Sequence, residues 1–569
     1  MLRYALKRVL PQRPLEFRSA PALFQTQTWS YSGRRIHDSA SHLPRIDDAT
    51  SFTNDDTIYA LSSGSGRAGI AVIRISGPGC LDVYHGLCPN KAPPKPRYAG
   101  VRTLFEPGLA DSPGANIVDS DALVLYFPGP KTVTGEDVLE LHVHGGPATV
   151  KAVLSAVRRC SSSREIRYAG PGEFTRRSFL NGRLDLAQIE SLGDTLAAET
   201  EHQRRAAVRG NSGTLGKTYD SWREQLLLAR GEIEALIDFS EDQHFDESPA
   251  ELLTNVTRLT EDILRSIELH KLGSQRSELL RNGIRIALLG PPNAGKSSLM
   301  NQIVGREASI VSAEAGTTRD IVEASLDIRG YLCSFADTAG IRTKMSGSLG
   351  HNDGTAASTI GAIEQEGIRR ARQKALDSDV IIVLASVEAT ESGNHRINYD
   401  LETLQLAAGA QQCLVAVNKT DIVSPESLEL LIQNFKSSVL ADIDGLGGLE
   451  PLTISCKAAA GLTDAGGIHE LTEILAQSFS SLTSLPDDMQ HLLGVTERQS
   501  QLLSECERHL GDFMTEAKKS DSYDEPDIVL AAEHLRLAGL RLASITGRGE
   551  SGDVDEVLGV IFEKFCVGK

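Results

Sequence analysis

The alternation of apolar and polar positions in the first third of the chain is typical of strands closed by turns. Residues 57–76 predict a strand, a glycine-rich loop and a second strand, and 122–130 and 138–146 predict two more strands that end in Pro or Gly turns. The pattern therefore predicts an α+β domain over residues 52–173.

Further along, the period of the apolar positions changes twice. Two stretches, one in the first half of the chain and one near its end, have apolar residues at helical spacing, which predicts an amphipathic helix in each. The first stretch has Leu226, Ala229, Ile233, Leu236 and Ile237 on one face, and the second has Ile528, Leu535, Leu542 and Ile545 on one face before Gly547. Between these stretches, short apolar runs at 284–290, 331–337, 379–386, 413–419 and 452–455 alternate with helical segments. This alternation predicts a mostly parallel sheet covered on both faces.

A chain of 569 residues is too long for a single core, so we expect several domains. The predicted division is a leader at 1–51, the α+β domain at 52–173, a first helical part at 174–279, the α/β domain at 280–482 and a second helical part at 483–569. The α/β domain would then be an insertion, and the two helical parts would pack on each other as one domain.

The amino-acid composition limits the cellular compartments and the binding partners that fit this chain. The net charge of −18 gives no electrostatic drive toward nucleic acid, so any RNA contact needs a local patch or a basic partner. No window is apolar enough to span a membrane, and the eight cysteines form no CxxC pair, which favours a reducing compartment. Residues 1–35 carry seven Arg or Lys and one acid, which predicts a mitochondrial transit peptide rather than a disordered basic tail.

The strongest chemical signal is the segment GPPNAGKS at 290–297, which follows a predicted strand and opens a predicted helix. Gly290, Gly295, Lys296 and Ser297 match the phosphate-binding loop GxxxxGKS, in which backbone N–H groups and a Lys hold phosphates and the Ser holds Mg²⁺. DTAG follows the next predicted strand, so Asp337 is expected to support Mg²⁺ and the Gly340 N–H to reach a γ-phosphate.

A second motif selects the base. Asp421 in NKTD follows a predicted buried strand, and its carboxylate can accept hydrogen bonds from the N1–H and 2-amino groups of guanine but not from adenine. The segment SCK at 455–457 is expected to back the base. The predicted nucleotide-binding residues from these motifs are Gly290, Asn293, Ala294, Gly295, Lys296, Ser297, Ser298, Asp337, Thr338, Ala339, Gly340, Asn418, Lys419, Asp421, Ser455, Cys456 and Lys457. Together they predict a Ras-like P-loop GTPase domain.

One part of the Ras-type machinery is absent. The position after DTAG, where Ras-type enzymes place a water-orienting Gln, is Ile341 here. Residues 290–342 resemble the G domain of the MnmE (also called TrmE) tRNA-modification GTPases, which use a potassium ion in place of an arginine finger. The resemblance implies K⁺ ligands at Asn293, Ser312, Glu314 and Thr317, a nucleotide-contacting Thr317, and Thr318 on both nucleotide and Mg²⁺.

The same resemblance supplies the missing water partner. It implies that Glu364 orients water and that hydrolysis requires two G domains to face each other. On spacing alone Glu364 could equally be a solvated helix charge. The segment between Asp337 and Glu364 is longer than the bacterial pattern and rich in Gly and Ser, so it predicts a flexible loop.

The resemblance extends over nearly all of residues 56–569. It implies that the N-terminal domain binds a tetrahydrofolate derivative (5-formyl or 5,10-methylene) and pairs with itself in a homodimer. Glu140 would hold the pterin, and Arg74, Arg183 and the Lys569 end would contribute polar and cationic contacts. Without the resemblance, the glycine-rich loop and the HGG segment would be taken as ordinary turns.

The C-terminal FCVGK is similar to the FC-(I/V)-GK end of the same family. It is not a prenylation motif, because Gly568 is not aliphatic and Lys569 is not an accepted last residue. The resemblance implies that Cys566 is a reactive thiol at the folate pocket, and a free surface thiol is the alternative.

The leading functional hypothesis is therefore a GTPase of the mitochondrial matrix. It would act with a flavin-dependent MnmG-type partner, which makes most of the tRNA contact, to modify wobble uridine at carbon 5 with a folate one-carbon unit. Two alternatives stay open: a ribosome-assembly GTPase of the Era or Der type, and a GTP switch with an inactive one-carbon site.

Overall fold

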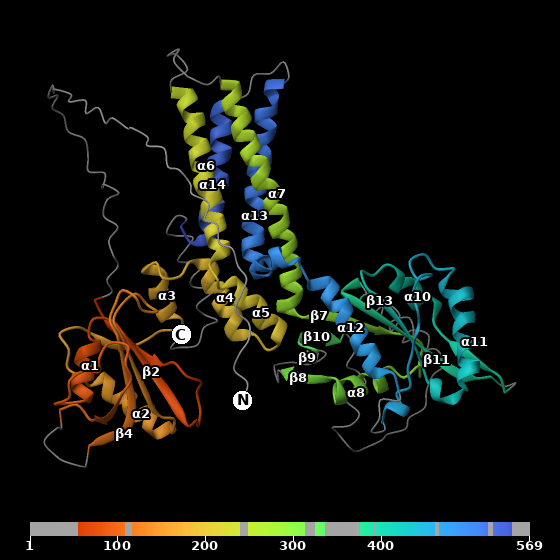
Figure 1. Cartoon of the computed structure of the whole chain (residues 1–569), viewed down its shortest axis with the longest axis horizontal. Coiled ribbons are helices and arrows are strands. Elements are labelled where there is room, and N and C mark those ends of the chain that lie inside the picture. The colour runs from red at the N-terminus through yellow and green to blue at the C-terminus, as the bar shows by residue number, and fades with distance from the viewer. Residues whose placement is uncertain are drawn as a thin grey trace, which may run out of the picture. The chain divides into compact units, whose positions relative to one another are not determined.

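The computed structural model describes residues 55–108, 116–238, 249–312, 325–335, 373, 376–390, 393–460, 466–521 and 527–548 (Figure 1). The predicted leader lies outside these residues, as do the segments 313–324, 336–372 and 549–569 that carry several predicted site residues. The described residues form two sheets and a set of long helices, which agrees with a multidomain α/β and α+β protein.

The N-terminal sheet has six strands in the order β3-β4-β5-β2-β1-β6. They are β1 (Thr57–Leu61), β2 (Ile70–Ser76), β3 (Gly100–Phe105), β4 (Ile117–Phe127), β5 (Val138–His144) and β6 (Ile166–Tyr168). All neighbours are antiparallel except β1 and β6. Helices α1 (Cys80–Leu87) and α2 (Pro147–Arg158) bury Val83 and Val153 in one core with Ile73 and Leu141 of the sheet. The four strands expected within 57–76, 122–130 and 138–146 are all present.

The helices on either side of the second sheet pack together. They are α3 (Glu173–Leu180), α4 (Leu186–Ala197), α5 (Glu201–Gly210), α6 (Thr214–Asp238) and α7 (Pro249–Asn282), then α13 (Glu497–Ala517) and α14 (Ile528–Thr546). Figure 1 shows α6, α7, α13 and α14 side by side, and their apolar faces share one core that includes Ile233, Ile267, Phe513 and Leu542. The two helical parts therefore meet. Lys271 of α7 forms an ion pair with Glu507 of α13, although the two residues are more than 200 positions apart in the sequence.

The second sheet lies between these helical parts in the sequence, with strand order β14-β13-β11-β7-β10-β9-β8 and β12 beside β11. Its strands are β7 (Ile284–Leu289), β8 (Ala308–Ser312), β9 (Ser325–Ile328), β10 (Tyr331–Phe335), β11 (Val380–Ala389), β12 (His395–Asn398), β13 (Cys413–Asn418) and β14 (Leu452–Thr453). Its helices are α8 (Lys296–Arg306), α10 (Leu401–Ala408), α11 (Pro425–Phe435) and α12 (Ile468–Thr483). Short helical turns are η2 (Thr420–Ile422), η3 (Lys436–Leu440), η4 (Ala458–Ala460), η5 (Asp487–Gly494) and η6 (Lys518–Asp521).

The five strands expected from the apolar runs are parallel neighbours, as predicted. The antiparallel strands β8, β9 and β12 were not predicted, because their short, partly exposed sequences lack a long apolar run. The β9–β10 hairpin turns at Arg329 and Gly330, both with positive φ. The predicted domain limits at 279 and 482 fall inside α7 and α12, and all four limits stay predictions.

Candidate functional site

The phosphate-binding loop connects the buried strand β7 to helix α8. Gly290 and Gly295 adopt φ of 140° and 102°, where L-residues are strained. A Cβ at Gly290 would lie 2.1 Å from the Leu384 carbonyl oxygen, and a Cβ at Gly295 would lie 2.2 Å from Nδ2 of Asn418. Only glycine fits at these two positions, so the motif spacing has a steric cause here.

Lys296, the first residue of α8, folds back over the loop. Its Nζ donates to the carbonyl oxygens of Gly290 and Pro291 at 2.8 and 2.9 Å. These bonds place the ammonium group over the loop and beside the first turn of α8, where Ser297 also lies. The positive end of an eleven-residue helix and a fixed cation favour an anionic ligand at this place.

Asn418 joins the phosphate loop to the predicted base-binding loop. Its buried side chain donates from Nδ2 to the Ala294 carbonyl at 2.8 Å and accepts at Oδ1 from the Cys456 N–H at 3.1 Å. The end of β13 therefore holds two loops that are far apart in the sequence. This is the arrangement that the order of motifs predicts.

Asp421 is held by the segment that was expected to back the base. Its Oδ1 accepts a hydrogen bond from Oγ of Ser455 at 2.7 Å, and Nζ of Lys457 lies 3.9 Å from Oδ2. Lys419 has a φ of 61° and pairs with Glu388 at 3.4 Å. A carboxylate fixed in this way is suited to accept the two N–H groups on one edge of guanine.

The remaining predicted ligands of this site cannot be placed. Glu314, Thr317, Thr318, Asp337, Thr338, Ala339, Gly340 and Glu364 lie outside the described residues. Ser312 ends β8, where it pairs with Ser325 of β9. Their roles toward Mg²⁺, K⁺ and water therefore stay predictions.

On the N-terminal sheet, two of the predicted folate ligands form a cross-strand pair. Arg74 of β2 lies opposite Glu140 of β5, and its Nε donates to Oε1 at 3.0 Å. Nε2 of His142 lies 3.5 Å from the other carboxylate oxygen. Arg183 donates instead to the Thr132 carbonyl at 3.0 Å, and Lys569 and Cys566 lie outside the described residues.

Sequence reasoning missed Arg177, which organises the carboxylates beside this sheet. Its side chain is 1% exposed and contacts Asp56 at 2.8 Å, Glu136 at 3.1 Å and Glu173 at 3.3 Å. Burial alone would raise the pKa of Asp56, but Arg177 and Arg167 hold that pKa below its usual value. In the sequence, Arg177 stands in the basic segment TRRSFLNGR at 175–183, and this pattern does not distinguish a buried Arg from an exposed one.

The cysteines in the described part of the chain are all free thiols. Burial raises the pKa of Cys456 to about 11 and that of Cys506 to about 12. These thiols are therefore protonated at neutral pH and poor nucleophiles.

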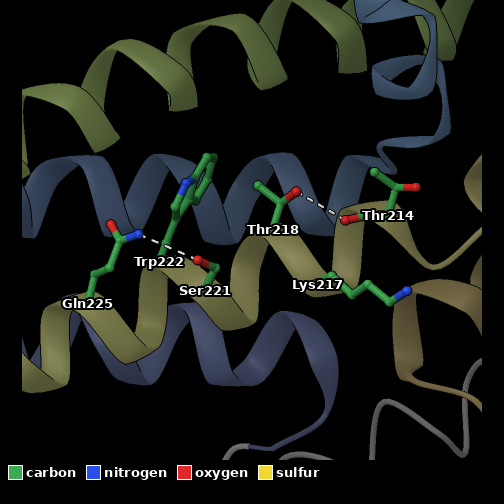
Figure 2. A pocket seen from close by; sticks show the side chains of 6 residues that line it. All are labelled: Thr214, Lys217, Thr218, Ser221, Trp222 and Gln225. Atoms are coloured by element: carbon green, nitrogen blue, oxygen red, sulfur yellow. Dashed lines mark hydrogen bonds between the residues drawn. The ribbon is translucent and has the colours of Figure 1, made fainter. Parts of the chain in front are cut away.

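A shallow hollow of about 330 Å³ lies along one side of α6, and none of the candidate site residues described above lines it (Figure 2). It is lined by Thr214, Lys217, Thr218, Ser221, Trp222 and Gln225. The polar groups are partly used within the helix, since Gln225 donates to Ser221 and Thr218 donates to the Thr214 carbonyl. Because the polar groups do not converge on one point, we assign no ligand to it.

A mostly parallel sheet with a glycine-dependent phosphate loop tied to an Asp-containing base loop defines a P-loop guanine-nucleotide-binding protein. Two family models match the chain: "GTP-binding protein TrmE N-terminus" over residues 57–183 and "MnmE helical domain" over residues 186–566, a range that includes the nucleotide site. The chain belongs to the MnmE/TrmE family of tRNA modification GTPases.

Individual relatives agree with this family. A protein named "5-taurinomethyluridine-[tRNA] synthase subunit GTPB3, mitochondrial" from Homo sapiens is 38% identical over 90% of this chain and 93% of its own length. "tRNA modification GTPase MSS1, mitochondrial" from Saccharomyces cerevisiae is 35% identical over 90% and 93%. "tRNA modification GTPase MnmE" from Parvibaculum lavamentivorans is 37% identical over 90% and 100%.

These findings confirm three predictions: the family, the GTPase class of enzyme, and the mitochondrial location, which is printed in the names of the animal and yeast relatives. Among solved structures, the G domain of the T. maritima FeoB iron transporter covers 34% of this chain and 98% of its own at 20% identity, with a TM-score of 0.20 that is too low for comparing folds. Within the described residues, no helix has the length and apolar character that a membrane crossing requires.

Proposed function

We propose that this protein is the GTP-hydrolysing subunit of a mitochondrial matrix system that modifies the wobble uridine of tRNA at carbon 5. The observation that carries the proposal is the Asn418 bridge, because it assembles a guanine-selective site in a chain whose other domains match the same tRNA-modification family. The added group is of the carboxymethylaminomethyl type or a relative of it, such as the taurinomethyl group in the printed name of the human relative.

The division of labour follows from charge. With a net charge of −18, the chain has no general attraction for the tRNA backbone. A flavin-dependent MnmG-type partner makes most of the tRNA contact and supplies redox chemistry, and GTP turnover rearranges the complex rather than donating a group. Nanomolar binding of tRNA by this chain alone at physiological salt would contradict this division.

The nucleotide site would use two ions. Mg²⁺ would be held by Ser297 and Thr318, and K⁺ by Asn293, Ser312, Glu314 and Thr317. Asn293 turns the loop with a φ of 61°, a left-handed backbone that Asn adopts more readily than most residues other than glycine, and the family resemblance alone carries its assignment to K⁺. A cation in this place offsets charge that develops between the β- and γ-phosphates, and G-domain pairing would bring Glu364 to the attacking water.

The potassium proposal is tested by comparing GTP hydrolysis in KCl and NaCl at equal ionic strength. We expect a much higher rate in KCl, and Asn293→Ala should remove most of the difference. Equal rates of the unsubstituted protein in the two salts would refute the use of K⁺. A strictly monomeric protein that hydrolyses GTP at full rate would refute the pairing of G domains.

The N-terminal domain would bind a tetrahydrofolate derivative and dimerise. The pterin amino edge requires a carboxylate and the glutamate tail requires cations, and Arg74 orients Glu140 for the first task. Isothermal titration with 5-formyltetrahydrofolate should show binding that Arg74→Ala weakens by roughly 10-fold or more, the loss expected for one charge-assisted hydrogen bond. Absence of binding by the unsubstituted protein would favour the GTP switch with an inactive one-carbon site.

The experiment that tests the whole proposal is mass spectrometry of mitochondrial tRNA nucleosides from cells with and without this protein. Loss of the carbon-5 group on wobble uridine, with other tRNA modifications unchanged, is the expected result. Normal wobble uridine together with defective mitochondrial ribosomes would favour the ribosome-assembly alternative instead.

A further inference from the structure

Two histidines and an aspartate that play no part in the proposed function meet between α13 and α14. His509 and Asp512 are three residues apart on α13, so both face the same side of that helix, and His534 of α14 lies across from them. Each of the three side chains has one nitrogen or oxygen atom that could bind a metal ion, and these three atoms lie within 4.8 Å of one another. Nδ1 of His534 is 4.0 Å from the Asp512 carboxylate, too far for a hydrogen bond.

The two imidazoles carry polar atoms that the fold does not satisfy. Within the described residues, both ring nitrogens of His509 and Nδ1 of His534 are buried without a hydrogen-bond partner. His509 is only 9% exposed. A buried polar atom without a partner costs about 1–3 kcal/mol, so three of them in one place indicate that a bound species completes the cluster.

The charged groups around the cluster indicate which kind of ion or molecule could bind there. Each imidazole, when neutral, offers the lone pair of one ring nitrogen to a cation, although Arg508 and Arg541 lie near His509. Arg541 is itself paired with Glu505 at 2.9 Å, which offsets its repulsion of a cation. The Asp512 carboxylate adds a negative charge and is half exposed, so it opens the cluster to solvent.

We propose that His509, Asp512 and His534 form a binding site for a divalent transition-metal ion, with zinc as the ion that this set of donors suits best. Two imidazoles and one carboxylate are a common three-ligand set for Zn²⁺, with water in the fourth position. Zn–N bonds of about 2.0–2.1 Å place tetrahedral ligand atoms about 3.3 Å apart, so side-chain rotations that move each atom by about 1 Å close the site.

The position of the site gives the ion a structural role. It lies between two packed helices that follow each other in the sequence, and α14 also packs on α6. A metal ion between them would hold α14 against α13 by binding one ring nitrogen of each imidazole. The ion would therefore stabilise the helical domain without touching the nucleotide.

The test uses the nucleotide-free full-length protein after removal of metals with a chelator. Titration with Co²⁺ as a spectroscopic probe should give visible d–d bands at one equivalent per chain, without the thiolate charge-transfer band of a cysteine site. Zn²⁺ should displace Co²⁺ and raise the melting temperature. His534→Gln and Asp512→Asn should each weaken Co²⁺ binding by at least 10-fold and abolish the zinc-dependent shift, whereas the matched control His395→Gln on β12 should behave as the unsubstituted protein.

Helical circular dichroism of each metal-free variant is the check on folding of the helical domain, and GTP affinity should be unchanged because the nucleotide site lies in a different domain. Asp512→Asn changes a side chain that is half exposed. Absence of a d–d band in the unsubstituted protein overturns the proposal. Equal Co²⁺ binding by all four proteins overturns it too, since the ion would then bind elsewhere in the chain.

Discussion

The nucleotide site and the N-terminal sheet site are built in different ways. At the nucleotide site, short contiguous motifs place backbone groups and glycines around one loop, and Asn418 ties two such motifs together. At the N-terminal sheet, charged side chains from distant positions meet: Arg74 and Glu140 are 66 residues apart, and Arg177 and Asp56 are 121 apart. The first site depends on local backbone shape and the second on long-range charge pairing.

This difference determines what each site tolerates. A loop closed by backbone contacts fails when a single atom is added, whereas a network of ion pairs fails when one charge is removed and the others stay buried. Substitutions should therefore separate the two regions: a steric change should affect only nucleotide binding, and a charge deletion should affect only the N-terminal domain.

The largest effect is expected from Gly290→Ala. Its Cβ would overlap the Leu384 carbonyl at 2.1 Å and would sit at a φ of 140°, so strain and overpacking together should cost about 4 kcal/mol. We expect GTP affinity to fall by roughly 1000-fold, measured by titration with a fluorescent GTP analogue.

The matched control is Gly305→Ala in α8, where an added Cβ meets no atom within 4 Å. Alanine is favoured over glycine in a helix, so this change should be neutral or slightly stabilising. If Gly290→Ala bound GTP as well as Gly305→Ala does, the steric account of the loop would be wrong.

Removal of the Arg177 guanidinium should be the next largest effect. Arg177→Met keeps most of the side-chain volume but leaves the Asp56, Glu136 and Glu173 carboxylates without their buried cation, which should cost about 3 kcal/mol. Because a multidomain chain does not unfold in one step, local hydrogen exchange of β1 and α3 is the suitable measurement.

The neighbouring Arg176→Met provides a control, because Arg176 is exposed. It should leave hydrogen exchange of β1 and α3 unchanged. GTP affinity should be normal in both variants. A loss of GTP binding in Arg177→Met but not in Arg176→Met would show that the two regions are coupled. It would contradict the expectation that a charge deletion affects only the N-terminal domain.

A smaller effect is expected from acid. Burial raises the pKa of Glu173, but Arg167 and Arg177 outweigh it, so the pKa values of Glu173 and Asp56 are lower in the folded protein than in the unfolded chain. Their stabilising contribution is thus complete above the ordinary carboxyl pKa of about 4 and is lost as the pH falls through the folded-state values. Protection of β1 and α3 should fall below about pH 4, and more weakly in Arg177→Met. Identical pH profiles for the two proteins would contradict this cause.

The same contrast explains what the sequence could predict. Gly290, Lys296 and Asp421 belong to motifs whose spacing follows from local geometry, and the structure brings the loops of Gly290 and Asp421 together through Asn418. Arg177 could not be distinguished from exposed arginines, since its burial depends on carboxylates up to 121 residues away. The β9–β10 hairpin was missed because β9 is a four-residue strand without a long apolar run, although Gly330, with its positive φ, suits a tight turn.

The smallest expected effect concerns the contact between α5 and the β9–β10 hairpin, which joins the helical part to the nucleotide-binding sheet. The His202 ring stacks on Tyr331 with centroids 3.8 Å apart, and its backbone N–H donates to the Gly330 carbonyl at 3.2 Å. His202→Ala should remove a stacking contribution of about 1 kcal/mol, and His202→Phe should retain it. The measurement is hydrogen exchange of residues 325–335, with GTP affinity unchanged. If neither variant loosened the hairpin, the ring stack would contribute nothing, and the backbone hydrogen bond from His202 to Gly330 would be the contact that matters.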